Sequence, residues 1–173
     1  MLCAEWWSFE IMVILAGILG VIEQAVNVIT FNVIAQLFMI PLGMQEASCA
    51  LIGNEIGANN PKLAKKYCKV ISTIALLCQI VICLLMAFGR KSIASVFTDE
   101  VQVQTLTASV MIILSVANLF DGLQCYCQGP IRALGLQSKA AFIALGCYYI
   151  VSIPLAAIFA FWCGWSVYGL WGG

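Results

Sequence analysis

The chain has 173 residues, of which 63% are hydrophobic and only 9% are charged. A soluble domain is about half apolar and about a quarter charged, so the composition excludes an ordinary soluble protein and indicates an integral membrane protein. Eight acidic residues balance eight basic ones. A chain without net charge lacks the basic footprint of a nucleic-acid-binding protein, so nucleic acid is excluded as a partner.

Five long apolar segments and the start of a sixth follow one another along the chain. A membrane-spanning helix needs about 20 mostly apolar residues. The segments that meet this requirement are 1–22, 27–52, 67–88, 103–134 and 139–162, and residues 167–173 begin another. The sequence therefore predicts an all-α integral membrane protein, a polytopic helix bundle that forms a single transmembrane domain over residues 1–173.

Charged residues lie mostly between the apolar segments, and their distribution predicts the topology. The two ends of the helices differ in net charge. At one end Arg90 and Lys91 are offset by Asp99 and Glu100, whereas the other end carries six bases. The positive-inside rule places the more basic side, with loop 53–66, in the cytoplasm. We therefore expect a multi-pass protein of the plasma membrane or an endomembrane. The bases on the cytoplasmic side are Lys62, Lys65, Lys66, Lys69, Arg132 and Lys139.

The connection that ends at Pro61 has the composition of a turn between two helices. Gly57 is predicted to take the left-handed conformation that ends a helix, and Pro61 suits the first turn of the next one. Pro41 and Pro154 lie inside apolar segments, where a proline kinks a membrane helix and is tolerated.

Besides Glu46, which lies near the inner end of the second segment, three carboxylates lie inside apolar segments: Glu5 and Glu10 in the string E-W-W-S-F-E, and Asp121 in L-F-D-G-L-Q. A charged side chain near the bilayer centre costs about 2.5–3.5 kcal/mol on insertion scales. Such acids indicate an ion or proton pathway with a polar cavity around it, although Glu5 also fits an exposed cytoplasmic acid. Trp6 and Trp7 fit either an interfacial aromatic belt or the walls of a site for an organic cation.

The fourth apolar segment carries a polar stripe made of Asn118, Asp121, Gln124 and Gln128. Their spacing places all four within about 120° of one face of a helix. This pattern predicts a cavity-lining face, with Asp121 as the carboxylate for an ion or substrate. The alternative is a row of hydrogen bonds between helices that holds the bundle together. Amides alone would serve that purpose without a charge.

The chain has nine cysteines and no histidine. Most of the cysteines lie in apolar segments, as small packing residues do. Without histidine, a zinc site at Cys125 and Cys127 is disfavoured, and the usual acid–base residue of a hydrolase is missing. We expect a protein that is not an enzyme, holds no metal and uses no organic cofactor, only a coupling ion.

Five strings, in order and in register, resemble eukaryotic multidrug and toxic compound extrusion (MATE) transporters. The first acidic string is similar to the seventh helix of that family, and N-L-F-D-G-L-Q at 118–124 is similar to its tenth. The other matching strings are G-N-E-I-G-A at 53–58, G-C-Y-Y-I at 146–150 and G-L-W at 169–171. The likeness covers essentially the whole chain.

The resemblance implies the C-terminal lobe of a twelve-helix secondary antiporter, whose N-terminal lobe would be a partner outside this chain. It implies small organic cations as substrates, protons or sodium as the coupling ion, and membrane lipid as surroundings. Carried over by position, Glu5, Glu10 and Asp121 match the family's C-terminal-lobe carboxylates. Glu46 and Leu51 depart from the family pattern near the inner end of the second segment.

Two other functions remain open on the sequence. The chain could be a truncated, non-transporting remnant or a regulatory half-protein that only packs against other helices. It could also be a flippase for lipid-linked substrates from the same superfamily. A flippase would need basic residues in its cavity to hold phosphates, and no base lies deep within an apolar segment.

Overall fold

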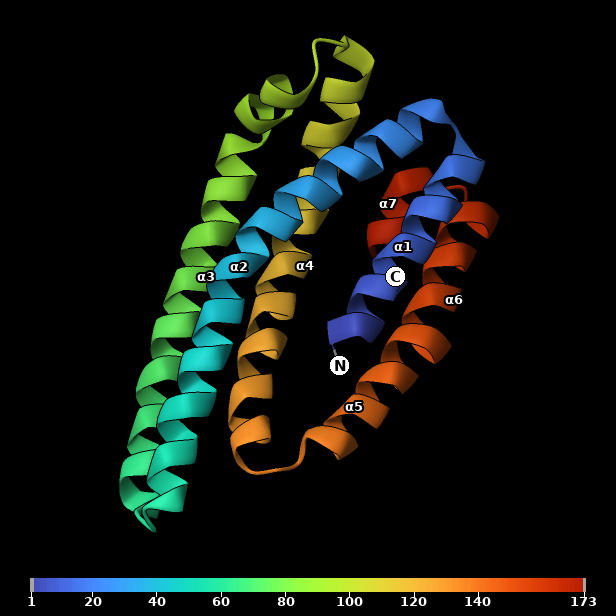
Figure 1. Cartoon of the computed structure of the whole chain (residues 1–173). Coiled ribbons are helices and arrows are strands. Elements are labelled where there is room, and N and C mark those ends of the chain that lie inside the picture. Colours follow the sequence, from blue (N-terminus) through green and yellow to red (C-terminus); the bar gives the residue numbers. More distant parts are fainter. Residues whose placement is uncertain (1, 173) are drawn as a thin grey trace.

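The computed structural model describes the backbone of residues 2–172 and the side chains of residues 6–172, and it is a bundle of helices (Figure 1). The predicted all-α membrane fold is confirmed. Four helical segments of the described chain are long and apolar enough to cross a membrane, and α1 is a shorter apolar helix. The elements are α1 (Leu2–Leu19), α2 (Val21–Gly57), α3 (Pro61–Phe97), α4 (Val101–Ala133), α5 (Gln137–Leu145), η1 (Gly146–Ser152), α6 (Ile153–Ala157), η2 (Ile158–Trp162) and α7 (Ser166–Gly172).

Helices α2 and α3 extend well beyond the predicted apolar segments 27–52 and 67–88, whereas α1 ends at Leu19, before the predicted end of its segment. Both α2 and α3 have 37 residues, which at about 1.5 Å per residue gives a length of about 55 Å. The hydrocarbon core of a bilayer is about 30 Å thick. Apolarity therefore marks where the chain meets lipid, whereas the helices continue into water through charged turns such as the one at Lys62–Lys69.

The turn between α2 and α3 differs from the prediction in one residue. Asn59, and not Gly57, has the positive φ angle, 56°. Asparagine visits this region more readily than most residues because its short polar side chain bonds locally. Gly57 still closes α2, and Pro61 occupies the first turn of α3 as predicted.

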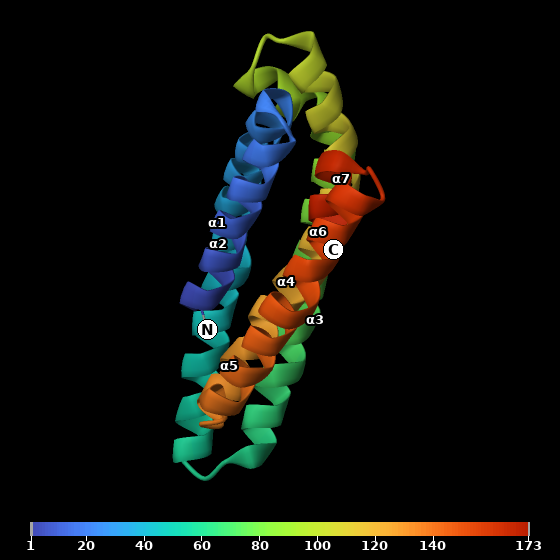
Figure 2. The ribbon, with the colours of Figure 1, turned by 90° about the vertical axis from the view of Figure 1, so that its right-hand side faces the viewer.

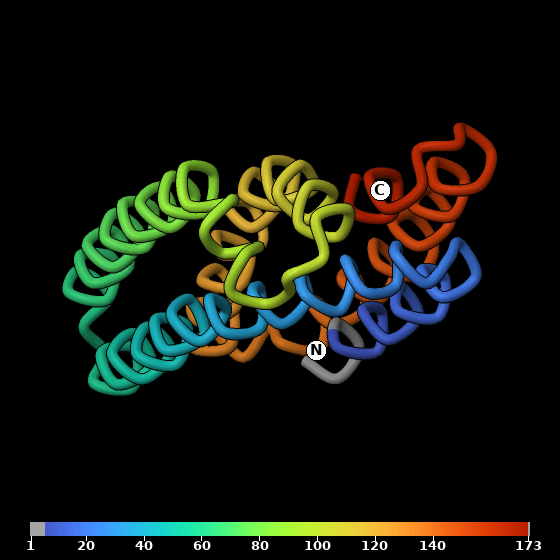
Figure 3. Tube along the Cα trace, turned by 90° about the horizontal axis from the view of Figure 1, so that it is seen from above, coloured from blue at the N-terminus to red at the C-terminus, as the bar shows by residue number. Residues whose placement is uncertain are grey.

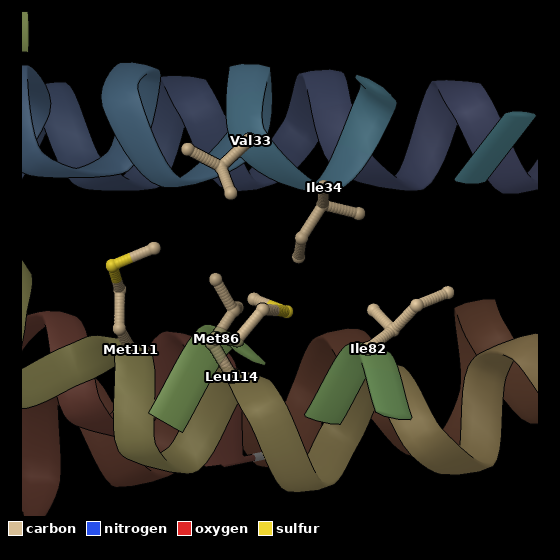
Figure 4. Packing of buried hydrophobic residues seen from close by; sticks show 6 residues of the cluster. All are labelled: Val33, Ile34, Ile82, Met86, Met111 and Leu114. Carbon is tan, nitrogen blue, oxygen red and sulfur yellow. The ribbon is translucent and has the colours of Figure 1, made fainter. Parts of the chain in front are cut away.

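Helix α4 is the centre of the bundle and packs against α2, α3 and α7. Seen along the bundle, α3, α4 and α7 form one row, and α2 and α1 form the other (Figure 3). The helical run from α5 to η2 starts near the end of α4 and diverges from it, and the chain returns through α7, which packs against α4 (Figure 1 and Figure 2). Residues from α2, α3 and α4 meet in an apolar core (Figure 4): Val33, Ile34, Ile82, Met86, Met111 and Leu114.

The distribution of polarity is that of a membrane protein. Gln79 is 2% exposed inside the bundle, whereas Phe88 on the same helix is 83% exposed. In water such an arrangement would leave large apolar side chains hydrated. In a bilayer the apolar face contacts lipid, and the amides find partners inside.

The helix that carries Pro154 has π-helical turns on both sides, η1 before and η2 after. Proline has no N–H, and its ring clashes with the carbonyl four residues earlier, so the hydrogen bonding of an α-helix cannot continue unchanged past it. A π-helical turn shifts the bonding by one residue, and the helix passes Pro154 without breaking.

Candidate functional site

The polar stripe of α4 is divided between two environments. Asn118 and Gln128 are buried, 5% and 4% exposed, whereas Asp121 and Gln124 are half-buried. All four are inside the bundle, as the periodicity predicts. The following contacts show that part of the stripe serves packing and part borders a cavity.

Asn118 connects α4 to α3. Its Nδ2 donates a hydrogen bond of 3.5 Å to Oε1 of Gln79, and both residues are buried. Gln79 lies directly over Gly122, where an added Cβ would collide with the Gln79 amide. A glycine at this position therefore admits the amide between the two helices, and the structural alternative holds for Asn118.

A second polar contact joins α4 to α2. The Cys125 thiol donates to Oε1 of Gln45 over 3.1 Å, and the Ser48 hydroxyl donates to the carbonyl oxygen of Gln45 over 2.8 Å. One turn further along α4, a Cβ at Gly129 would collide with Ser48 Oγ and with the main chain of Gln45. The two backbones approach so closely here that only glycine fits.

Asp121 of α4 borders three neighbouring cavities: residues of α1 and α2 help to line two of them, and residues of α5, η1 and α7 line the third. The first, about 150 Å³, also borders Ser8, Asn118 and Trp171. A larger one of about 670 Å³ contains Gln124 and Gln128. A small one of about 20 Å³ lies toward α1 and α2. Among the described residues that line the three, Asp121 is the only charged one.

Aromatic rings form the wall of the small cavity opposite Asp121. The Trp6 ring packs edge-on against Phe31, with centroids 6.0 Å apart, and against Phe38 at 6.5 Å. Phe9 connects this group to Trp171, at 6.1 Å between centroids. Asp121 and these aromatic side chains therefore line the same small cavity.

Sequence reasoning missed three polar residues of the first cavity: Ser8, Tyr148 and Ser152. Tyr148 and Ser152 come from η1 and also line the larger cavity. Serine and tyrosine are common in membrane helices, so their types gave no signal. Only the tertiary arrangement identifies them, in which η1 packs against α1 and lines these cavities together with α4, although the string G-C-Y-Y-I marked the segment.

The remaining predicted site residues lie elsewhere. Glu10 is exposed and is not among the described residues that line the Asp121 cavities. Trp7 is 69% exposed and likewise does not reach them, whereas Trp6 does. The side chain of Glu5 lies outside the described residues. Of the predicted site residues, Trp6 and the polar stripe of α4 thus line the cavities around Asp121, and Glu10 and Trp7 lie outside them.

Glu46 and Arg132 form an ion pair between α2 and the end of α4. Their side chains are 55% and 34% exposed, so water weakens the attraction. The departure noted at Glu46 is therefore matched by a base on the neighbouring helix. The pair lies beyond Gly129, at the end of the bundle opposite the α3–α4 connection.

A bundle of membrane-spanning helices whose described residues place one charged side chain, Asp121, at the cavities between them fits a polytopic transport protein. The MatE family model matches residues 1–158. Protein DETOXIFICATION 16 of Arabidopsis thaliana is 39% identical over the whole chain, and mouse multidrug and toxin extrusion protein 1 is 34% identical. The chain belongs to the MATE family.

The chain spans about a third of the length of these relatives, 36% and 30% respectively. The crystal structure of the eukaryotic MATE transporter AtDTX14 superposes with a TM-score of 0.93 and 32% identity, over 98% of this chain and 38% of that one. An inward-facing MATE transporter of the MOP superfamily shares the fold at a TM-score of 0.69 and 13% identity.

Proposed function

We propose that this chain forms the C-terminal lobe of a secondary antiporter that exports small organic cations in exchange for protons or sodium. The observation that carries the proposal is the position of Asp121, the only charge among the described residues of three neighbouring cavities. A transport role, and not an enzymatic one, also fits the family.

Electrostatics explains how one carboxylate could exchange two ligands. Opposite unit charges about 4 Å apart attract by about 1 kcal/mol in water and about 4 kcal/mol at an effective dielectric constant of 20. A protonated, neutral Asp121 loses this attraction. Proton and cation would therefore compete for the same group, and the cation would leave when the proton arrives.

The aromatic wall adds a second source of affinity for the same class of substrate. A cation over the face of a tryptophan gains about 0.5–2 kcal/mol, and Trp6 lines the small cavity with Asp121. Because ring faces attract a charged nitrogen without a fixed hydrogen-bonding pattern, they favour cations of varied shape.

Transport also requires two conformations that differ in their contacts with the carboxylate. We infer that the N-terminal lobe of the complete transporter, a partner outside this chain, supplies the other wall of the pathway. Glu5 and Glu10 remain candidates for proton-binding groups in that assembly, and Trp7 for a wall residue. The basic loop 53–66 would face the cytoplasm.

The flippase alternative is less favoured because no base is among the described residues of the cavities. Phosphate recognition usually relies on arginine or lysine. The non-transporting alternative would make Asp121 dispensable, so the same experiment addresses it.

The test is efflux of a fluorescent organic cation from proteoliposomes that contain the complete gene product, with proton and sodium gradients applied separately. We expect Asp121→Asn to abolish gradient-driven efflux while membrane insertion is unchanged. Asp99→Asn, which removes an acid from the exposed α3–α4 connection, is the matched control. Undiminished efflux in Asp121→Asn would remove this residue from the mechanism.

A further inference from the structure

A second polar site lies far from Asp121, between the end of α3 and the start of α4. Its cavity of about 350 Å³ is lined by two bases and four uncharged residues: Arg90, Lys91, Gln104, Thr105, Ala108 and Ser109. None of these residues borders the Asp121 cavities. The α3–α4 connection above it is visible at the top of Figure 1.

No acid is among the described residues that line this cavity, and its two bases form no ion pair, although Asp99 and Glu100 lie in the adjoining connection. The ion pair found among the described side chains is Glu46–Arg132. Neither Arg90 nor Lys91 is therefore paired with a described acid. The Thr105 and Ser109 hydroxyls donate to backbone carbonyls of their own helix, and Gln104 Nε2 donates to Thr98 O over 2.6 Å. The two bases are thus the charged donors that remain for a ligand, and their charge favours an anion.

The level of the cavity along α3 indicates where that anion comes from. Positions 70–89 of α3, between Lys69 and Arg90, contain no charged residue. These 20 residues extend about 30 Å at 1.5 Å per residue, which is about the thickness of the hydrocarbon core. Arg90 and Lys91 therefore lie at the depth of the lipid headgroups.

Apolar stripes lead from the cavity toward the membrane centre on both helices. On α3, Phe88 and Leu84 lie three and seven residues before Lys91, hence on its face of the helix, and they are 83% and 49% exposed. On α4, Ile112 and Val116 continue the face of Ser109 and are 45% and 51% exposed. An acyl chain that lies along these stripes would place its headgroup at the cavity.

We propose that this cavity binds the phosphate group of a membrane phospholipid, with Arg90 and Lys91 as its ligands and the acyl chains along the α3 and α4 stripes. Arginine suits the role because its planar fork donates two parallel hydrogen bonds to phosphate oxygens. The lipid would hold together the ends of α3 and α4, whose connection it borders.

The experiment uses the complete gene product, purified in mild detergent, with bound lipid measured by native mass spectrometry and by thermal shift. The probes are phosphatidylglycerol, the matching diacylglycerol without phosphate, and inorganic phosphate alone. We expect phosphatidylglycerol to be retained and to stabilise the wild-type protein, and the other two to do neither. Equal stabilisation by diacylglycerol would overturn the role of the phosphate, and equal stabilisation by inorganic phosphate would overturn the lipid.

Arg90→Gln/Lys91→Gln tests the residues. Each base near a membrane surface contributes about fivefold in affinity, so we expect the double variant to retain phosphatidylglycerol at least about tenfold more weakly. Lys65→Gln/Lys66→Gln makes the same change of charge at the exposed opposite end of α3. If this control loses as much lipid as the double variant, general surface attraction explains the binding and the proposed site is contradicted.

Discussion

Replacing Gly129 by alanine tests the close approach of α2 and α4 that positions the wall of the cavity. The added Cβ would lie closer to Ser48 Oγ and to the Gln45 carbonyl oxygen than the 3.0 Å below which real Cβ contacts essentially never fall. The serine hydroxyl could rotate, but the carbonyl belongs to the main chain. The two helices must therefore separate, and Gly129→Ala is expected to lower stability.

The magnitude follows from comparison with a glycine that has free space. A Cβ at Gly43, inside α2, would meet nothing within 4 Å, so Gly43→Ala should show only the gain in helix propensity, about 1 kcal/mol. Gly129→Ala shares this gain but adds an overpacking cost of about 1–3 kcal/mol. The difference between the two variants is the overpacking cost alone.

The assay is thermal denaturation of both variants in the same detergent. Denaturation is monitored by the loss of the monodisperse peak in size-exclusion chromatography. A change of 1 kcal/mol shifts the melting temperature by about 2–4 °C in a protein of about this size. Gly129→Ala should therefore melt about 2–12 °C below Gly43→Ala. Equal melting temperatures, or a more stable Gly129→Ala, would refute the close approach.

Three other predictions concern the contacts around the site. Asn118→Leu should lower stability by about 1–3 kcal/mol because it leaves the buried Gln79 amide unpaired, and Asn118→Leu/Gln79→Leu should recover part of the loss in a double-mutant cycle; additive losses would show that the pair does not interact. Trp6→Leu should weaken cation binding about 2- to 30-fold, which corresponds to about 0.5–2 kcal/mol of cation–π attraction, whereas Trp162→Leu, at a ring that is 88% exposed and outside the Asp121 cavities, should have little effect; equal losses measured by fluorescence titration would argue against the aromatic wall. Glu46→Gln should change stability by less than about 1 kcal/mol, as expected of an exposed ion pair, and a larger drop in melting temperature would mean that the pair is part of a buried network.

The sequence predicted the helices and the polar face of α4 because both depend on local pattern. An apolar segment of about 20 residues is long enough for a membrane-spanning helix. The three- and four-residue spacing from Asn118 to Gln128 places those side chains on one face of a helix, whichever helices pack around it. The ends of α2 and α3 were not predictable from apolarity, since charged residues such as Lys62 and Lys66 extend a helix in water.

The partners of that face depended on tertiary packing. Nothing near Gln79 in the sequence indicates that it lies over Gly122, because that contact is set by how α3 packs on α4. Tyr148 and Ser152 reach the cavity through a π-helical segment, whose position depends on Pro154 and on the neighbouring helices. The Glu10 side chain is exposed and lies outside the cavities of Asp121, so its role as a second acid of the pathway stays a prediction.

The central claim is that proton and organic cation compete for Asp121. The direct measurement is proton release when tetraethylammonium is added to the purified complete gene product in weakly buffered solution. Since a neutral carboxyl must lose its proton to attract the cation, the account predicts release of about one proton per cation bound under conditions where the free carboxyl is protonated, and none from Asp121→Asn. Cation binding without proton or sodium release, or unchanged release from Asp121→Asn, would contradict it.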